Sequence, residues 1–520
     1  MNHLTKKLLS VTMLLSVVTV SADTTSGLSY FLPRAQSGTA YDVLGWNHAI
    51  HKYDADDFYF DFKVQSEWRQ TFDSTKLGQY IFFNGTNSMI FGPNFANNAA
   101  TSVYSLNFLL PDGATGFKST VTANPKVQSS ITSFDFFFGL DGWVSGLWVQ
   151  ANLPLVWTRW NPNLMETITT AVPAAGFAAG EVQAAALATT PYANVIAAWK
   201  GDKTAGDANV VWSYGRINGS QSKTALGEVS VELGYDFIQR ENGHLALALR
   251  GEFGAGGKSK AQYVFEPTVG YGGRMGIGGM IDGAVRLWER DEDHNFWVYL
   301  TGYAVHLFAG NEVRNYDLTA CGVGSRYNLV KKLTTINAAA PSVYSNIDNM
   351  INIGAQTAKI SLDVVYEATI QFSYMTGNVG LDFGYSVGGH GAEKFSKWVS
   401  AITGNYILYD PVNGGNVLNA ANQATGSTMV TVAGNTTGTT FAPVTTANQS
   451  TYLITNASLL QSSALAKSAM GQCIYGNLSY TWKDNDWTPC ISIFADVEFS
   501  SPSNRSLNTW GVGLQGNVSY

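Results

Sequence analysis

The chain has 520 residues, a formal net charge of −7 and only 13% charged residues, against roughly 25% in average soluble domains. Aromatic residues make up another 13%, and glycine occurs 53 times but proline only 14 times. The acidic balance argues against a nucleic-acid partner, which needs a basic face. Three cysteines are too few for a disulfide scaffold of this length.

The first 22 residues have the pattern of a secretory signal peptide. Lys6 and Lys7 precede a short apolar stretch, Leu8 to Val20, and small residues follow it up to Ala22. A basic start, a short apolar core and small residues before the cut are the three parts of such a peptide. The stretch is also too short to span a bilayer as a helix, which needs roughly 20 apolar residues.

No later apolar run is long enough for a transmembrane helix, and the strongest period is two. Phe58, Phe60, Phe62 and Val64 alternate with polar residues, and the same rhythm continues between positions 360 and 374. Side chains alternate across a strand, so each stretch has one apolar and one largely polar face. A soluble secreted β-sandwich would show this pattern too, with its apolar face turned inward, so other features must separate the two folds.

The length of the candidate strands favours a membrane barrel. Soluble strands usually run about 5–6 residues, whereas membrane strands need roughly 9–11. Fourteen candidates, of which the second and third are weak, are found at residues 56–72, 79–91, 102–110, 126–140, 142–157, 222–238, 243–254, 276–289, 296–309, 358–374, 379–388, 472–482, 490–500 and 506–520. We therefore expect about 14 strands, within a range of 12–18.

The connections between these candidates alternate between short and long. The short ones centre near residues 141, 240, 292, 377 and 484, and the long ones span 158–221, 310–357 and 389–471. Outer-membrane barrels combine short periplasmic turns with long external loops. The sequence thus predicts an all-β fold, a closed antiparallel transmembrane β-barrel over residues 56–520. Residues 23–55, which show no strand pattern, are expected to lie in the periplasm or to plug the lumen.

The last eleven residues carry a family resemblance. Trp510, Val512, Leu514, Val518 and Tyr520 share one face of the final strand, and polar residues or glycine occupy the other. This pattern resembles the closing strand of Gram-negative outer-membrane barrels of the porin-like class. The resemblance implies a bacterial outer-membrane location, contact with its lipid, and recognition of Val518 and Tyr520 by the barrel-assembly machinery. The Asn-Pro-Ala motif of the fatty-acid transporter barrels is absent near the N-terminus, so no particular family is assigned.

The polar faces of the strands, turned inward, would line the lumen with an excess of acids. The predicted lumen charges are Asp61, Lys63, Glu67, Arg69, Asp135, Glu228, Glu232, Asp236, Arg250, Glu252, Asp282, Arg286, Lys359, Asp363, Glu367, Asp382, Asp496 and Glu498. Charged rings inside a pore determine which ions enter. We therefore expect a porin-like channel for passive diffusion of small hydrophilic solutes or ions, with a modest cation preference.

Two other interpretations stay open. These charges would form salt bridges that fill the lumen if it is narrow, as in small barrels. Alternatively, the barrel anchors a surface-exposed structural or adhesion protein whose large external loops carry the function. The sequence also leaves open whether the chain forms a homo-oligomer.

Residues for catalysis or metal binding are not recognisable. Gly384 to Gly388 match the G-x-S-x-G nucleophile pattern around Ser386, but that motif works only at a strand-to-helix turn, and here it lies in an alternating strand. We expect no enzyme, no cofactor and no metal site, and we place His48 and His51 at the surface because no third ligand is near them. Cys321 is expected either to reach Cys473 as a disulfide or to remain a free thiol.

Overall fold

The computed structural model describes most of the predicted barrel and short parts of the segment before it. The described residues are 29–33, 49–53, 57–82, 84–92, 102–111, 116–177, 182, 186, 188–291, 293–336, 342–409, 423–424, 453–483, 487–500 and 507–520. The predicted signal peptide, residues 1–22, lies outside them. Across these ranges, no helix combines the length and the apolar character needed to cross a membrane.

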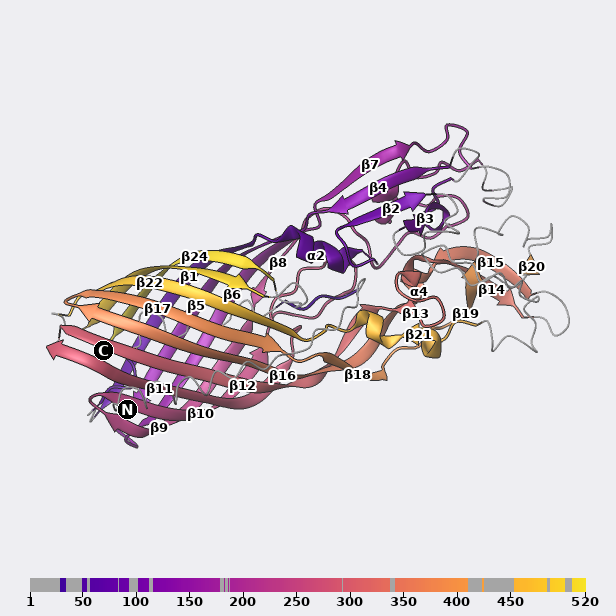
Figure 1. Ribbon diagram of the computed structural model, residues 1–520. Helices are drawn as coiled ribbons and strands as arrows, with labels where there is room; N and C mark the ends of the chain where they lie inside the picture. The colour runs from indigo at the N-terminus through magenta and orange to yellow at the C-terminus, as the bar shows by residue number, and fades with distance from the viewer. Residues whose placement is uncertain are drawn as a thin grey trace, which may run out of the picture.

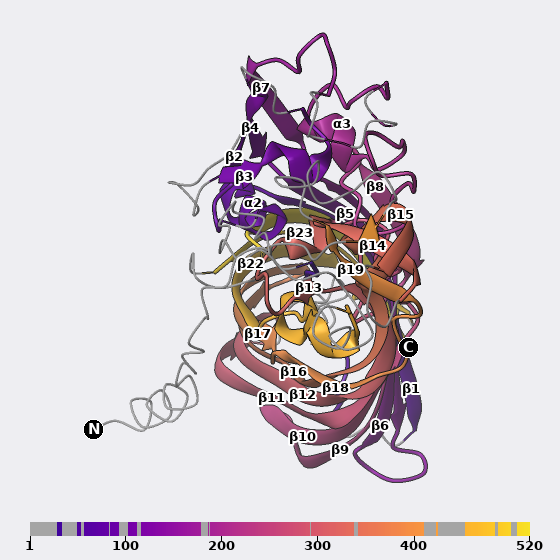
Figure 2. The ribbon, with the colours of Figure 1, turned by 90° about the vertical axis from the view of Figure 1, so that its right-hand side faces the viewer.

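Twelve of the described strands close into an antiparallel barrel (Figures 1 and 2). In chain order they are β1 (Phe58–Thr71), β5 (Lys126–Leu140), β6 (Leu147–Asn161), β9 (Glu228–Arg240), β10 (Gly243–Gly254), β11 (Met275–Asp291), β12 (His294–Asn315), β16 (Ala355–Thr376), β17 (Val379–His390), β22 (Ala469–Thr481), β23 (Thr488–Phe499) and β24 (Thr509–Ser519). Two further strands, β8 (Gln221–Leu226) and β18 (Glu393–Trp398), pair with β6 and β16 outside the ring.

The last strand closes the ring against the first. β24 pairs with β1 over eleven positions, from Asp61 opposite Ser519 to Thr71 opposite Thr509. β1 in turn pairs with β5, and β12 pairs with β16 across the long connection between them. Because every strand of the ring then has two neighbours, its backbone groups are satisfied within the barrel, as a strand in lipid requires.

The ring has twelve strands, fewer than the expected fourteen but within the expected range of 12–18. Twelve of the fourteen candidates correspond to the twelve ring strands. The two weak candidates, 79–91 and 102–110, do not belong to it. The chain there forms the helix α2 (Ser74–Ile81), then the short strands β2 (Ser88–Gly92) and β3 (Ser102–Tyr104) of a separate sheet. The apolar residues at these positions pack in a core beyond the barrel and not on a ring strand.

Short connections between ring strands lie at one end of the barrel, and long connections lie at the other. At one end, the connections β5–β6, β9–β10, β11–β12, β16–β17 and β22–β23 have two or six residues each. At the other end, the connections between consecutive ring strands have 9 to 78 residues. Both β1 and β24 have their outer termini at the short-turn end, where Figure 1 also shows the C-terminus.

The long connections build an extension beyond the barrel (Figure 1). One sheet contains β2, β3, β4 (Lys118–Ala123) and β7 (Leu164–Thr170), and another contains β14 (Leu329–Thr335), β15 (Ser342–Asn349), β19 (Asn405–Tyr409) and β20 (Gln423–Ala424). The remaining elements are α3 (Val195–Trp199), α4 (Met350–Ile353) and the strand pair β13 (Asp317–Leu318) with β21 (Leu459–Leu460). Phe91, Trp199 and Ile347 belong to one buried apolar cluster, which joins the two sheets.

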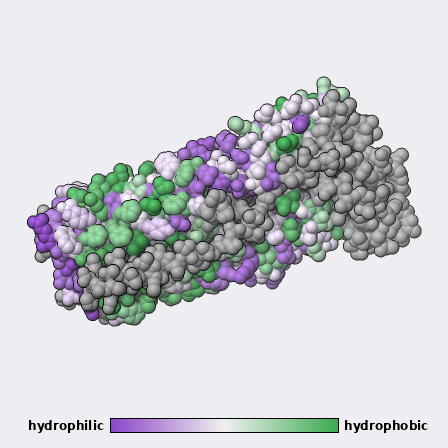
Figure 3. Space-filling view, viewed as in Figure 1, coloured by the Kyte–Doolittle hydropathy of each residue, from purple (hydrophilic) through white to green (hydrophobic). Residues whose placement is uncertain are grey.

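The barrel is polar inside and apolar outside. In β1, Asp61, Lys63 and Glu67 are buried, whereas Phe58 and Trp68 are exposed. β24 repeats the pattern, with Leu514 61% exposed and its polar neighbour Gln515 buried. Figure 3 shows hydrophobic side chains over the barrel strands and hydrophilic ones at the short-turn end. A soluble sandwich would bury the opposite face, so this distribution favours a barrel in lipid.

One strand exchanges its faces part-way along. In β16, Ile360 and Leu362 are buried, but further along Glu367 and Gln371 are buried instead. The pairing with β12 shifts register on either side of Leu307. An extra residue in one strand turns every later side chain to the other face. Ile360 and Leu362 therefore point inward near the extension, where the sequence placed them on the outer face.

Candidate functional site

The interior of the barrel gathers nearly all the charges that the sequence assigned to the lumen. Fourteen of them are buried in the structure: Asp61, Lys63, Glu67, Asp135, Glu228, Glu232, Asp236, Arg250, Glu252, Asp282, Glu367, Asp382, Asp496 and Glu498. The side chain of Arg69 lies among them, and that of Arg286 lies at the short-turn rim, where it pairs with Glu241 and Glu289.

Asp363 was placed in the lumen wrongly. Its side chain is 40% exposed and forms an ion pair with Lys394 of β18, which lies outside the ring. The β16 register shift near this residue causes the error, because uninterrupted alternation from Glu367 would have turned Asp363 inward. Lys359 was also expected in the lumen, and it lies opposite Lys397 of β18. Its neighbours Ala358 and Ile360 are fully buried, so the side chain of Lys359 points away from the lumen as that of Asp363 does.

Much of the lumen charge is paired across neighbouring strands. Lys63 lies 3.5 Å from Asp135, and Arg250 contacts both Glu232 and Glu252. The guanidinium of Arg69 bridges Glu67, Asp496 and Glu498 at 2.8, 3.5 and 3.3 Å. These pairs agree with the alternative in which salt bridges occupy the lumen.

Other lumen acids are hydrogen-bonded by neutral groups. Asp61 accepts hydrogen bonds from Asn517 and Ser519 of β24. Asp382 of β17 accepts one from Asn477, at 2.8 Å. Neutral donors satisfy a carboxylate without cancelling its charge, and the ammonium groups of Lys52 and Lys63 lie near enough to Asp61 to stabilise its charged form.

A hydrophilic pocket opens at this end of the lumen. It has a volume of about 220 Å³ and lies between β16, β17, β22, β23 and β24 on one side and the N-terminal residues 49–52 on the other. Most lining side chains carry a hydroxyl, amide or charged group, among them Gln371, Asp382, Ser479, Asn517 and Ser519.

Residues 29–33 of the N-terminal segment lie inside the barrel near the extension. The ring of Tyr30 covers the guanidinium of Arg314, with 3.1 Å from the guanidinium carbon to the ring centroid. Leu32 belongs to a buried apolar cluster with Val305 and Leu362, and its carbonyl oxygen lies 3.3 Å from Nε2 of His390. These contacts place the segment against lumen-facing residues of several strands.

Beneath Tyr30 lies a buried network of four charges. Glu393 of β18 lies 2.6 Å from Arg274 and 3.1 Å from Arg314, and Glu312 contacts both arginines as well. The backbone N–H of Ala466 donates to Glu393. This network could not be predicted from the sequence, because Arg274 lies outside the candidate strands and Glu312 and Arg314 lie in a predicted loop.

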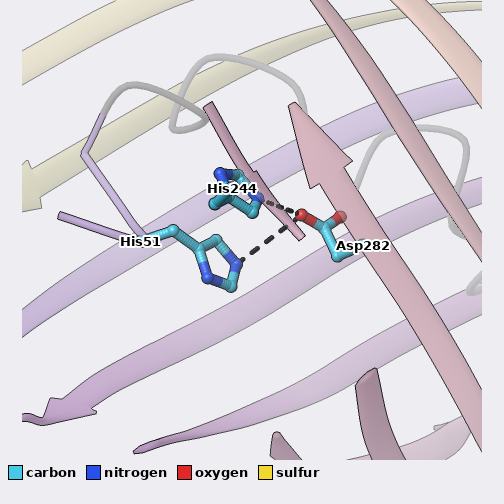
Figure 4. Close-up of side chains that lie close together, drawn as sticks. All are labelled: His51, His244 and Asp282. Atoms are coloured by element: carbon cyan, nitrogen blue, oxygen red, sulfur yellow. Dashed lines mark hydrogen bonds and ion pairs between the residues drawn. The ribbon is translucent and has the colours of Figure 1, made fainter. Parts of the chain in front are cut away.

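Residues 49–53 occupy the other end of the lumen and bring His51 to the wall. His51 was expected at the surface, but it is only 7% exposed. Its Nδ1 lies 3.0 Å from Asp236, its Nε2 lies 3.7 Å from Asp282, and its ring stacks on that of His244 at 4.2 Å (Figure 4). Burial alone would lower the pKa of His51, but the hydrogen bond to Asp236 and the charges of Asp236 and Asp282 raise it above the ordinary value. The spacing of histidines along the sequence could not show this cluster, because its members come from the N-terminal segment and three strands.

Ser386 and the cysteines lie where they support no reactive site. Ser386 is fully buried within β17, opposite Thr369 and Cys473, so the strand-to-helix turn of a nucleophile motif is not formed there. Cys321, Cys473 and Cys490 are all buried free thiols, so the Cys321–Cys473 disulfide is not formed.

Comparison with known proteins finds likeness only among solved structures. No family model matches the chain, and no curated protein matches it. An outer membrane channel from Pseudomonas putida F1 aligns over 90% of this chain and 97% of its own, with 9% identity and a TM-score of 0.33. A Pseudomonas aeruginosa FadL homologue aligns over 95% and 99%, with 6% identity and a TM-score of 0.29. The Pseudomonas putida toluene transporter TodX aligns over 95% of both chains, with 9% identity and a TM-score of 0.28. Such neighbours are outer-membrane β-barrel proteins.

Proposed function

We propose that the chain is an outer-membrane channel for passive diffusion of small hydrophilic solutes, with a modest cation preference. In this conformation, residues 29–33 and 49–53 of the N-terminal segment occupy the passage. The observation that carries this proposal is the polar interior of a closed barrel whose outer face is apolar.

The outer-membrane location follows from the outer face. Leu233 of β9, Leu249 of β10, Phe383 of β17 and Leu514 of β24, at different places around the ring, are all about half exposed or more. A contiguous apolar surface of this extent is unfavourable in water, and lipid would cover it. The predicted signal peptide provides the export that such a location needs.

The pocket at the short-turn end supports a hydrophilic solute. Hydroxyl and amide groups line it together with Asp382, Lys52 and Lys483, and Ala49, Met375 and Cys490 add apolar surface. A polar solute exchanges hydrogen bonds with water for hydrogen bonds with such walls, whereas an apolar solute gains little there. The cation preference is supported by the excess of acids among the buried lumen residues and by Asp61 and Asp382, whose hydrogen-bond donors are neutral.

Conductance across planar lipid bilayers tests the proposal. We expect a chain lacking residues 23–53 to conduct more than the full chain, because residues 29–33 and 49–53 lie in the lumen. Under a KCl gradient, the reversal potential should indicate cation preference. Asp61→Asn and Asp382→Asn should weaken this preference, whereas the matched control Asp363→Asn, outside the lumen, should not. Absence of conductance in both chains, or an anion preference, would contradict the proposal.

The extension supports a second candidate, a surface-exposed structural or adhesion protein anchored by the barrel. Its two sheets share a large apolar core, which is more than a solvated loop needs. A variant with a short turn in place of residues 164–220 would distinguish the two candidate functions. A channel would still conduct, whereas adhesion of cells that display the chain would be lost if the extension carries the function.

A further inference from the structure

The cluster at the short-turn end of the lumen has the composition of a metal site. His51 comes from the N-terminal segment, His244 from β10 and Asp282 from β11. The potential ligand atoms of these three residues lie within 4.8 Å of one another (Figure 4). Nε2 of His244 lies 2.7 Å from Oδ1 of Asp282, and Nε2 of His51 lies 3.7 Å from the same oxygen.

The distances between these ligand atoms are compatible with an ion in tetrahedral coordination. Zn²⁺ bonds of about 2.0–2.2 Å at tetrahedral angles hold neighbouring ligand atoms roughly 3.3 Å apart. The two distances to Oδ1 of Asp282, 2.7 and 3.7 Å, lie on either side of this value. Because the imidazole rings of His51 and His244 are stacked, with centroids 4.2 Å and planes 16° apart, one ring has to turn about its side-chain bonds before both Nε2 lone pairs point at one ion. Two imidazoles and one carboxylate leave a fourth position for water.

A second layer of hydrogen bonds orients the donors. Nδ1 of His51 contacts both carboxylate oxygens of Asp236, at 3.1 and 3.0 Å. When Nδ1–H donates to this carboxylate, the lone pair of Nε2 points toward Asp282. The hydroxyl of Thr301 donates to the other oxygen of Asp282, which leaves Oδ1 turned toward the histidines. Metal-binding histidines almost always have such a carboxylate or carbonyl partner on the second nitrogen.

The surroundings favour a bound cation. The rings of Phe137 and Trp148 pack edge-on against His51, each at 5.1 Å. They exclude water on that side, so charges in the cluster interact more strongly than at a surface. Two carboxylates, Asp236 and Asp282, lie next to two histidines, and with neutral imidazoles a divalent ion would balance their charge.

We propose that His51, His244 and Asp282 bind a divalent transition metal ion of the Zn²⁺ class, which fastens the N-terminal segment to the barrel wall. Asp236 is the positioning residue for His51. This proposal concerns metal binding, and it does not depend on whether the barrel conducts.

Titration with Co²⁺, a spectroscopic substitute for Zn²⁺, tests the site in the full chain refolded in detergent without a histidine tag. We expect one Co²⁺ per chain, with the intense visible absorption of a tetrahedral complex, and displacement by Zn²⁺. His51→Gln, His244→Gln and Asp282→Asn should each abolish this band. Asp236→Asn should weaken binding about 10- to 100-fold, because it removes the partner of a ligand rather than a ligand.

The matched control is His306→Gln, an exposed histidine whose Nδ1 lies 2.7 Å from the carbonyl oxygen of Asp363. It should bind Co²⁺ as the unaltered chain does. Heat-modifiable gel migration shows which variants have folded, and only these are compared. Failure of the folded unaltered chain to bind Co²⁺ or Zn²⁺ would overturn the proposal. Binding that persists unchanged in His51→Gln and Asp282→Asn would overturn it as well, because the ion would then lie elsewhere.

Discussion

Val518 lies directly opposite Phe62 where the last strand of the barrel pairs with the first. On either side, the inward-facing pairs are Asp61 with Ser519 and Lys63 with Asn517. The pairing therefore joins the two ends of the sheet and also sets which side chains enter the lumen. Without it, β1 would present a free edge, and an open sheet edge is not tolerated in lipid.

The first prediction concerns assembly. The resemblance to closing strands of outer-membrane barrels implies that Val518 and Tyr520 are read by the assembly machinery. We therefore expect the double change Val518→Ser and Tyr520→Ala to reduce the heat-modifiable form in the outer-membrane fraction of expressing cells. Refolding of the same purified chain in detergent should be largely retained, because the eleven backbone pairs of β24 with β1 remain. Phe58→Ala, at the same end of the barrel, is the control, and equal amounts of folded protein in cells for both variants would contradict the prediction.

The second prediction tests the lipid-facing surface. Leu514 is exposed in the middle of β24. Leu514→Arg should lower the free energy of unfolding in lipid by about 2–4 kcal/mol, because the charge would lie near the bilayer midplane. Phe58→Arg, at the short-turn end of β1, should cost only about 0–1 kcal/mol, because the charge reaches the interface. Urea titration in vesicles measures both. In a water-exposed protein, Leu514→Arg would change stability by about 0.5 kcal/mol or less, and that result would contradict a membrane location for this strand.

The ring could be predicted from the sequence because its signal is local. Alternation in β1 and β24 is visible in the order of residues, and the short turns are visible as gaps between alternating stretches. The two weak candidates failed for a physical reason. Apolar residues such as Phe91 and Phe108 belong to the core of the extension, where short strands and a 3-10 turn bury them equally well.

The contacts inside the lumen could not be predicted in the same way. The register shift in β16 is a change of one position in pairing, and no residue type near Asp363 marks it. His51 lies 185 residues from Asp236 along the chain, and they meet only because the N-terminal segment enters the barrel. Sequence spacing reports contacts within one element, whereas these contacts depend on how distant elements pack.

The third prediction concerns the buried charge network. Glu393→Gln should lower stability by about 3–5 kcal/mol, because it leaves Arg274 and Arg314 with one carboxylate, Glu312, in a buried site. The neighbouring Lys394→Gln removes an exposed partner of Asp363 and should cost at most about 1 kcal/mol. Denaturant unfolding of both variants gives the comparison. Equal costs would mean that the network contributes no more than an exposed ion pair.

The fourth prediction concerns thiol reactivity. Burial, followed by the charge of Asp317, raises the pKa of Cys321 to about 11. Only the thiolate reacts with maleimides and disulfide reagents, so Cys321 should resist labelling at pH 7–8 in the folded protein. Mass spectrometry of peptides labelled before and after unfolding checks this. Cys490 lines the hydrophilic pocket and is the internal comparison; small reagents should label it before Cys321, and the reverse order would be inconsistent with this packing.

The fifth prediction concerns the contact that holds residues 29–33 in the lumen. Tyr30→Ala removes the ring over Arg314, and a desolvated cation–π contact is worth about 1–2 kcal/mol. Because each 1.4 kcal/mol is a factor of ten in an equilibrium, the population with a displaced segment should rise about 5- to 30-fold. In single-channel recordings this change appears as more frequent opening with unchanged conductance of each open channel. Tyr53→Ala, an exposed tyrosine near the other end of the lumen, is the control and should leave the opening frequency unchanged. If Tyr30→Ala also leaves it unchanged, the Tyr30–Arg314 contact does not hold the channel closed.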